Sequence, residues 1–287
     1  MKVTLLGSTG TIGRAVLREL RLQGYDVACP GRSDLQSFDL SGTDAVISCL
    51  ASRTGTPRDA WHVDHDLNAA VLTAAETAAV PQFILLSAIC VQKPRLAFQH
   101  AKRAFEERLA SSDMRYAIIR PTAYFKSLSG QAERLRAGKR FLTFGDGTLT
   151  ACKPISDGDL ARYICRALTD RAMDNRVLPI GGPGPALTAR AQGELLAAAL
   201  DVPFRTRSVP PALLKVAART LGVLGLQEKA ALARIGHYYA TESMLLWTGQ
   251  RYDPDATPEF GSDTLAEHFG ALARGDVLDD RDGHAVF

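Results

Sequence analysis

The sequence predicts an α/β fold: a doubly wound parallel sheet with helices on both faces, followed by a smaller and mostly helical lobe. Two observations support this. Short apolar runs alternate with helical patterns through the first 180 residues, and a glycine-rich turn joins the first run to the first helix. Strands that alternate with helices are typical of parallel sheets, because each crossover needs a helix to return the chain to the same edge. We therefore expect residues 1–180 to form the sheet domain and residues 181–287 the lobe.

The strands of the first domain are predicted from short runs rich in Val, Ile, Leu and Phe. These runs lie at residues 3–6, 26–29, 44–50, 83–87, 116–119 and 177–180. Apolar residues that recur at helical spacing predict helices at 13–22, 68–79, 97–109 and 159–168. The segment 33–43 is too short for the additional helices that domains of this type place there. We expect a trimmed sheet at that edge.

The second half of the chain has a different pattern. The cluster Gly181-Gly182-Pro183-Gly184-Pro185 is a turn signal, and the segments after it are mostly helical. Helices are expected at residues 189–200, 211–224, 228–238 and near 264–272.

Composition excludes several classes of protein. The chain has 287 residues, 46% of them hydrophobic, and its net charge of +3 is too small for a nucleic-acid-binding face. The longest apolar candidate for a membrane span, 209–226, is interrupted by Lys215 and Arg219. Five cysteines without a CxxC pattern indicate reduced thiols, and no secretory signal is visible at the N-terminus. A cytoplasmic protein is expected.

The turn Gly7-Ser8-Thr9-Gly10-Thr11-Ile12-Gly13 is a GxxGxxG fingerprint between a strand and a helix. Glycines at these positions let backbone N–H groups approach a pyrophosphate at the helix N-terminus, so the turn predicts a Rossmann-type dinucleotide site. Arg32 follows the second strand, where an acidic residue would bind the ribose 2′-hydroxyl of NAD. A guanidinium there favours the 2′-phosphate of NADPH. Asp39 is expected beside the adenine, with a simple turn residue as the alternative.

Ser87 ends a strand, and Lys102 follows fifteen residues later on a helix. This spacing resembles the short-chain dehydrogenase/reductase superfamily, in which Ser and a Tyr-x-x-x-Lys pair perform the chemistry. Phe98 occupies the tyrosine position here, and phenylalanine cannot exchange a proton. The departure indicates an atypical branch of the superfamily. It suggests either no reaction or hydride addition to an alkene whose conjugated system disperses the charge until a proton arrives from water.

Several longer stretches resemble one family of that branch, the NADPH-dependent divinyl (proto)chlorophyllide 8-vinyl reductases. They are Ser48–Gly55, Leu85–Pro94, Phe98-Gln99 with Ala101-Lys102, Arg120–Leu128, Cys152–Ser156, Leu178–Gly184, Tyr238–Met244 and Ala285–Phe287. The resemblance implies reduction of the 8-vinyl group of divinyl chlorophyllide or protochlorophyllide to ethyl, in chlorophyll or bacteriochlorophyll synthesis. A bacterial cytoplasmic enzyme is implied, since the plant members carry a transit peptide, and a loose contact with membranes is left open.

The resemblance also implies roles for individual residues. Gly7, Gly10, Gly13 and Arg32 match the cofactor pattern, and Leu50-Ala51-Ser52 are expected to pass the cofactor phosphates and ribose. Ser87 and Lys102 are expected at the nicotinamide ribose, and Pro121-Thr122-Ala123 beside the nicotinamide. The substrate would be a flat magnesium porphyrin or chlorin bound mainly by the C-terminal lobe.

On the substrate side, Tyr124 is a candidate proton donor or stacking residue, with core packing as the alternative. Lys126 or Lys153 could pair with the pigment propionate, with a solvated surface lysine as the alternative. Cys90 could be a weak acid or a small buried core residue, and His237 could ligate the pigment magnesium or be an ordinary core or surface histidine. His62 and His65 recur at metal-ligand spacing without a third ligand, so no protein-bound metal is expected. Two other functions remain open: an NADP-binding regulatory protein without turnover, and a reductase of another conjugated substrate.

Overall fold

The computed structural model describes residues 1–31, 34 and 38–276, and the chain divides into two compact units. The first unit comprises Met1–Pro121 and Asp157–Ile180, and the second comprises Thr122–Ser156 and Gly181–Phe287. The first unit ends at Ile180, and the expected division into domains 1–180 and 181–287 stays a prediction. The segment Thr122–Ser156, expected in the sheet domain, clusters instead with the second unit.

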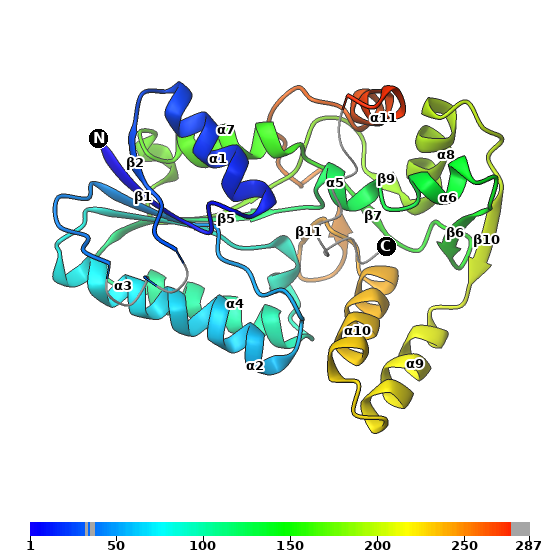
Figure 1. Ribbon diagram of the computed structural model, residues 1–287, viewed down its shortest axis with the longest axis horizontal. Helices are drawn as coiled ribbons and strands as arrows, with labels where there is room; N and C mark the ends of the chain where they lie inside the picture. The colour runs from blue at the N-terminus through cyan, green and yellow to red at the C-terminus, as the bar shows by residue number, and fades with distance from the viewer. Residues whose placement is uncertain (32–33, 35–37, 277–287) are drawn as a thin grey trace. The chain divides into compact units, whose positions relative to one another are not determined.

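The first unit is built on a six-stranded sheet of order β2-β1-β3-β4-β5-β8 (Figure 1). Every neighbouring pair is parallel. The strands are β1 (Lys2–Leu6), β2 (Asp26–Ala28), β3 (Ala45–Ser48), β4 (Gln82–Leu86), β5 (Arg115–Pro121) and β8 (Arg176–Ile180). The predicted α/β fold class is confirmed, and each strand lies within a few residues of its expected position.

Helices cover both faces of this sheet (Figure 1). On one face α1 (Thr11–Leu22) packs against α7 (Asp157–Arg166). The other face carries a continuous helical run and α4 (Ala97–Ala110). That run consists of α2 (Pro57–Ala60), a π-helical segment (Trp61–Leu67) and α3 (Asn68–Thr77). The sequence predicted α1, α3, α4 and α7, but not the turns between Pro57 and Leu67.

The inner strands β1, β3 and β4 are almost completely buried, as expected for a parallel sheet covered on both faces, whereas the edge strands β2 and β8 are partly exposed. The core between the sheet and α3–α4 includes Val46, Phe83, Phe105 and Ile118, and the rings of Phe83 and Phe105 lie 5.8 Å apart. Strand β2 ends the sheet, and no helix occurs in the described residues between β2 and β3. The expectation of a trimmed edge is therefore confirmed over those residues.

The second unit has its own core and is mainly helical. Its larger helices are α8 (Ala189–Ala199), α9 (Ala212–Val223), α10 (Gln227–Thr241) and α11 (Leu265–Arg274), all near their predicted positions. Short helices α5 (Phe125–Leu128) and α6 (Ala132–Arg136) and three two-stranded sheets complete it: β6 (Phe141–Phe144) with β10 (Thr206–Val209), β7 (Ala151–Cys152) with β9 (Leu187–Thr188), and β11 (Leu246–Trp247) with β12 (Tyr252–Asp253). Phe141, Leu196 and Phe269 belong to its buried core. Among the described residues, no helix combines the length and the apolar character that crossing a bilayer requires.

Candidate active site

The glycine turn between β1 and α1 has a geometry that only glycine satisfies at two positions. Gly7 has φ +72°, and a Cβ there would lie 2.7 Å from the carbonyl oxygen of Cys49. A Cβ at Gly13 would lie 2.0 Å from the carbonyl oxygen of Gly7. These two residues therefore bring the turn close to the loop after β3 and the helix close to the turn. Gly10 is less constrained, because its nearest neighbour would be 3.4 Å away.

The N-terminus of α1 is suited to an anion. Its N-cap residue is Gly10, no side chain caps the first turn, and no acidic residue lies in that turn. Of the other fingerprint residues, Ser8 and Thr9 lie in the turn, and Thr11 and Ile12 begin α1. Uncapped N–H groups at a helix N-terminus, reached through a glycine turn, form a cradle for phosphate oxygens. The residues present thus fit a dinucleotide.

Two other candidates for cofactor contact lie after β2. Arg32, on which the preference for NADPH rests, is outside the described residues. Asp39 is exposed, and its Oδ1 accepts a hydrogen bond of 2.9 Å from the Ser41 backbone N–H. Hydrogen bonds from Ser41 hold the pKa of Asp39 below its ordinary value. Its visible role is that of a turn residue, which was the alternative reading.

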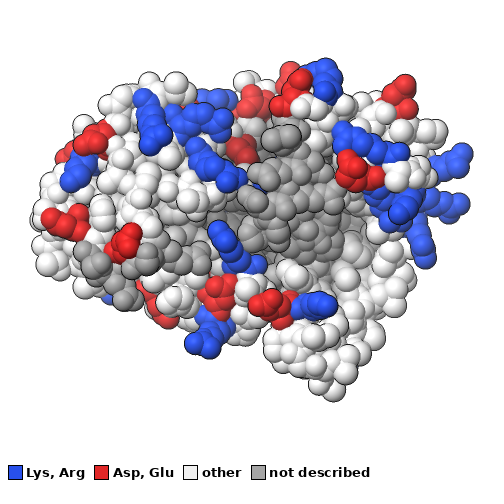
Figure 2. Space-filling view, in the orientation of Figure 1, with Lys and Arg blue, Asp and Glu red and all other residues white. Residues whose placement is uncertain are grey.

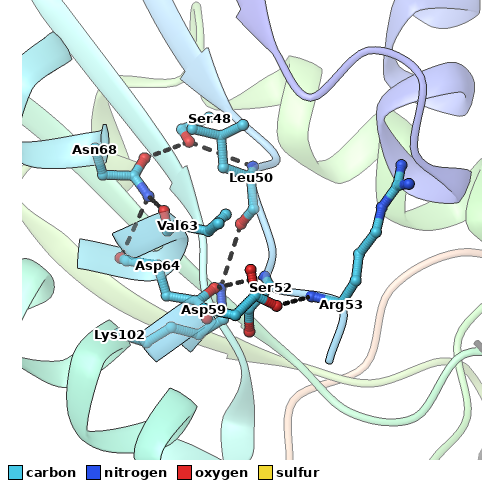
Figure 3. A network of polar contacts seen from close by, with 9 residues as sticks. All are labelled: Ser48, Leu50, Ser52, Arg53, Asp59, Val63, Asp64, Asn68 and Lys102. Carbon is cyan, nitrogen blue, oxygen red and sulfur yellow. Dashed lines mark hydrogen bonds and ion pairs between the residues drawn. The ribbon is translucent and has the colours of Figure 1, made fainter. Parts of the chain in front are cut away.

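The loop after β3 is tied to the helical run that follows it (Figure 3). Asp59 Oδ2 accepts hydrogen bonds of 2.8 Å from the backbone N–H groups of both Arg53 and Thr54. The Ser52 N–H points to Asp64 Oδ1 at 3.4 Å. Two carboxylates thereby fix the backbone of Ser52, Arg53 and Thr54, and Ser52 is the last of the three residues Leu50-Ala51-Ser52 that were predicted to contact the cofactor.

Lys102 reaches the same loop from α4 (Figure 3). Its Nζ lies 3.0 Å from Asp64 Oδ1 and donates to the Leu50 carbonyl oxygen at 3.4 Å. The Asp64 side chain is completely buried, and the Lys102 side chain is only 10% exposed. Within the described residues, two of the three ammonium donors find acceptors, so the third is available to a ligand hydroxyl. Asp64 was not predicted from the sequence.

The π-helical segment explains how a carboxylate comes to lie there. A π turn leaves its backbone carbonyl groups displaced from the usual helical ladder. Asn68 compensates: its Nδ2 donates to the carbonyl oxygens of Val63 and Asp64 at 3.2 and 3.3 Å, and its Oδ1 accepts from Ser48 Oγ at 2.5 Å. The Asn68 side chain thus links the segment to β3. The available sequence signal was a pair of polar residues, Asp64 and Asn68, each next to an apolar residue on the buried side.

Buried polar atoms without partners mark the region around Ser87 and α4. Among the described residues, Ser87 Oγ, Gln99 Nε2 and Asp64 Oδ2 have no hydrogen-bond partner. Gln99 is fully buried, and its Oε1 accepts from the backbone N–H groups of Arg95 and Leu96, which fixes the start of α4. Buried donors and acceptors are normally satisfied, so these atoms are available to a polar ligand. Phe98 is on the same helix, one turn before Lys102, and is partly exposed.

In the second unit, parts of three stretches quoted for the family resemblance lie together: Arg120–Leu128, Cys152–Ser156 and Leu178–Gly184. Thr122 Oγ1 donates to the Lys153 carbonyl oxygen, and a Cβ at Gly181 would lie 2.8 Å from Lys153 Cβ. The Ile155 N–H donates to the Ala123 carbonyl oxygen at 2.9 Å. Pro121 is the last residue of β5 and is buried. Close packing therefore determines the conformation of the segment predicted to border the nicotinamide.

The substrate-side candidates have varied surroundings. Lys153 is buried, and its ammonium forms an ion pair with Glu259, whose pKa the hydrogen bond from Lys153 lowers. Its charge is thus already compensated, whereas Lys126 is partly exposed on α5. Tyr124 precedes α5 and pairs with Ile155 in an isolated β-bridge. The remaining candidates are Cys90, which is buried, and His237, which is partly exposed on α10.

Neither a metal cluster nor a disulfide is found in the described part of the chain. No group of three or more His, Cys, Asp or Glu side chains is arranged there to hold a metal ion, and His65 contacts Asp66. All five cysteines lie within the described residues, and no disulfide joins them. Burial raises the pKa of the Cys152 and Cys165 thiols to about 12, which makes them structural rather than reactive.

Comparison with known proteins agrees with this geometry. An NAD(P)H-binding family model matches residues 32–171. The divinyl chlorophyllide a 8-vinyl-reductase of Oryza sativa (indica) is 40% identical over 95% of this chain and 78% of its own length. The corresponding reductase of Arabidopsis thaliana is 39% identical over 96% of this chain and 77% of its own length. This chain belongs to the divinyl chlorophyllide a 8-vinyl-reductase family. The family resemblance inferred from the sequence is confirmed.

Other proteins are similar to this chain over only part of its length, or share only its fold. The photosystem II assembly factor Ycf39 of Guillardia theta is 24% identical over 63% of this chain and 65% of its own length. Among solved structures, the UDP-glucose 4-epimerase of Thermotoga maritima with UDP-glucose matches with a TM-score of 0.70, 18% identity and coverage of 96% and 98%. The NADPH-dependent quinone oxidoreductase of Escherichia coli with NADPH matches with a TM-score of 0.67 and 18% identity, and the match covers 94% of this chain and 99% of that chain. These structures share the fold.

Proposed function

We propose that this chain is an NADPH-dependent reductase that converts the 8-vinyl group of divinyl chlorophyllide a, or of divinyl protochlorophyllide a, to ethyl. The observation that carries the proposal is identity of about 40% to plant 8-vinyl-reductases along 95% of the chain. The site supports it, because a glycine cradle and an adjacent buried lysine suit a dinucleotide with ribose hydroxyls.

The residues of the first unit have assigned roles in this proposal. Gly7, Gly10 and Gly13 receive the pyrophosphate, and Leu50-Ala51-Ser52 pass alongside it. Lys102, oriented by Asp64, holds the nicotinamide ribose together with Ser87. Pro121-Thr122-Ala123 border the nicotinamide, and Arg32 binds the 2′-phosphate. When bound, NADPH supplies the hydride.

The proton is the second requirement of the reaction. Reduction of vinyl to ethyl adds one hydride and one proton across a carbon–carbon double bond. Phe98 stands where related enzymes have a tyrosine, so α4 offers no phenolic acid at that position. The conjugated macrocycle disperses the negative charge left by hydride addition, and water can then deliver the proton. Tyr124 is the alternative donor in this proposal.

The experiment is a product analysis. The purified chain is incubated with NADPH and divinyl chlorophyllide a. The pigments are then separated by chromatography, and their molecular masses are measured by mass spectrometry. The proposal requires a monovinyl product two mass units heavier than the substrate and one NADPH consumed per product. An active plant 8-vinyl-reductase serves as the positive control. No product at high enzyme concentration would disprove the proposal.

One specific observation favours a second function. Phe98 removes the usual acid, which is also what an NADP-binding regulatory protein without turnover would show. Such a protein would bind NADPH but leave it unoxidised with every pigment offered. A reductase of another conjugated substrate would oxidise NADPH with small enones and not with the macrocycle.

The proposal includes a peripheral contact of the chain with membranes. The compartment, bacterial cytoplasm, stays a prediction of the sequence, and so does the role of the second unit in binding the pigment.

A further inference from the structure

The hairpin of α9 and α10 has an exposed apolar surface. Twelve large hydrophobic side chains are exposed in the described part of the chain, and six of them belong to this hairpin: Leu213, Val216, Val223, Leu224, Leu226 and Leu232. Val223 is 89% exposed and Leu224 66%, and both lie at the turn between the helices. In Figure 1 the two helices lie side by side and meet at that turn, and in Figure 2 the visible surface at the tip is white.

The exposed residues of α9 form a stripe. Leu213, Val216 and Val223 are separated by three and seven positions, which places them on one helical face. Ala218, on the opposite side, is the single buried residue of this twelve-residue helix, and α9 packs against α10. Surface helices normally bury their apolar stripe, whereas α9 turns its stripe to solvent. Clustered exposed apolar residues of this kind mark an interaction surface.

The charges of the hairpin favour a negatively charged partner. Four basic side chains of the hairpin are exposed, Lys215, Arg219, Lys229 and Arg234, against one exposed acid, Glu228. The difference, 4 − 1 = +3, equals the formal net charge of the whole chain. Lys215 and Arg219 are one helical turn apart and border the apolar stripe. A second copy of this chain would bring these positive charges together across an isologous contact, which disfavours self-association through this face.

We propose that the α9–α10 hairpin docks on the surface of an anionic lipid bilayer. The apolar turn Val223–Leu226 enters the boundary between headgroups and acyl chains, and the flanking lysines and arginines contact lipid phosphates. An apolar face with basic edges, on helices that cannot span a bilayer, is the pattern of an interfacial helix. The inference specifies the membrane contact included in the proposed function, but it does not depend on the reductase activity.

The experiment uses the full chain without pigment or cofactor. Sedimentation is measured with vesicles of phosphatidylcholine alone and with vesicles containing about 30% phosphatidylglycerol. We expect binding to the anionic vesicles that weakens as salt is added. The double variant Val223→Ser/Leu224→Ser should bind them roughly tenfold or more weakly, because two aliphatic side chains no longer enter the bilayer. Lys215→Gln/Arg219→Gln should weaken binding and reduce its salt dependence.

A matched control is Leu22→Ser, since Leu22 is 77% exposed and lies in the first unit. This variant should sediment with vesicles as the unaltered chain does. Equal binding by the Val223→Ser/Leu224→Ser variant, or no binding by the unaltered chain, would overturn the proposal. So would a dimer in light scattering that this variant converts to a monomer. Because the assay contains no substrate, either failure leaves the reductase assignment to be judged by its own product analysis.

Discussion

Lys102 Nζ lies 3.0 Å from Asp64 Oδ1, and both side chains are withdrawn from solvent. Asp64 also contacts the Ser52 N–H, so one carboxylate links the lysine of α4 to the loop after β3. The second oxygen, Oδ2, has no partner among the described residues. We interpret Asp64 as a positioning residue: it directs the Lys102 ammonium and the loop toward the place where we propose the cofactor ribose.

Replacement of Asp64 by Asn should therefore weaken both folding and cofactor binding. Removing one partner of a buried ion pair costs on the order of 3 kcal/mol, because the other charge stays buried without compensation. We expect NADPH affinity, measured by calorimetry, to fall roughly tenfold. Asp66→Asn is the control, since the Asp66 side chain is 61% exposed. The double variant Asp64→Asn/Lys102→Met should unfold at a higher denaturant concentration than Asp64→Asn alone; equal midpoints would argue against a coupled pair.

In the glycine turn, Gly13 is required for close packing of the chain, whereas we expect Gly10 to be required only for the bound cofactor. Gly13→Ala places a methyl group 2.0 Å from the Gly7 carbonyl oxygen, so it should destabilise the fold by about 1–3 kcal/mol and remove NADPH binding. Gly10→Ala has room in the chain itself, with its nearest neighbour at 3.4 Å. It should leave the unfolding midpoint nearly unchanged while weakening NADPH binding. Unchanged affinity in Gly10→Ala would mean that this turn is not the phosphate site.

Restoring the superfamily tyrosine tests where the proton comes from. If hydride addition precedes protonation by water, Phe98→Tyr should change the rate of vinyl reduction by less than about threefold, because no positioned acid is needed on α4. The rate is measured by single turnover with NADPH. Lys102→Ala is the contrast, and it should lower both cofactor affinity and rate. A large acceleration in Phe98→Tyr would show that proton transfer limits the rate, and it would contradict late protonation by water.

The stability of the second unit should depend on one histidine. His268 lies between Ser129, whose Oγ is 3.1 Å from its Nε2, and the ring of Phe125, and burial lowers its pKa below the ordinary value of 6.5. Because the unfolded chain binds the proton more readily, the free energy of unfolding should decrease as pH falls below about 6.5. Denaturant unfolding at pH 7.5 and 5.5 measures the effect. The decrease in unfolding free energy should be smaller in His268→Gln than in the unaltered chain. It should be unchanged in His100→Gln, because His100 is exposed. An equal decrease in the unaltered chain and both variants would exclude His268 as the source of the pH dependence.

Sequence reasoning predicted the strands well because most of them contain a short apolar run such as Phe83–Leu86. It missed the helical run before Asn68 for a physical reason. The buried positions there are Ala60, Val63, Asp64, Leu67 and Asn68, which follow the ordinary helical spacing. Two of the five, Asp64 and Asn68, are polar, so the sequence shows no continuous apolar stripe over this run. Asp64 lies between His62 and His65, and only the spacing of these two histidines was considered for a function.

The second unit shows another limit of local patterns. Strand β6 pairs with β10 more than sixty residues further along the chain, and Lys153 pairs with Glu259 at a separation of 106 residues. No local pattern indicates such partners, which explains why Thr122–Ser156 was expected in the first domain. The family resemblance nevertheless picked out Arg120–Leu128, Cys152–Ser156 and Leu178–Gly184, and contacts of Thr122, Lys153 and Gly181 bring these stretches together.

Isotope tracing with NADPH deuterated at the transferred position of its nicotinamide tests the central claim most directly. Divinyl chlorophyllide a is incubated with the chain and the labelled cofactor, and the product is analysed by mass spectrometry and NMR. We predict one deuterium in the 8-ethyl group from the cofactor and, in a parallel reaction in heavy water with unlabelled cofactor, one from solvent. A monovinyl product without cofactor-derived deuterium, or no monovinyl product at all, would contradict the account.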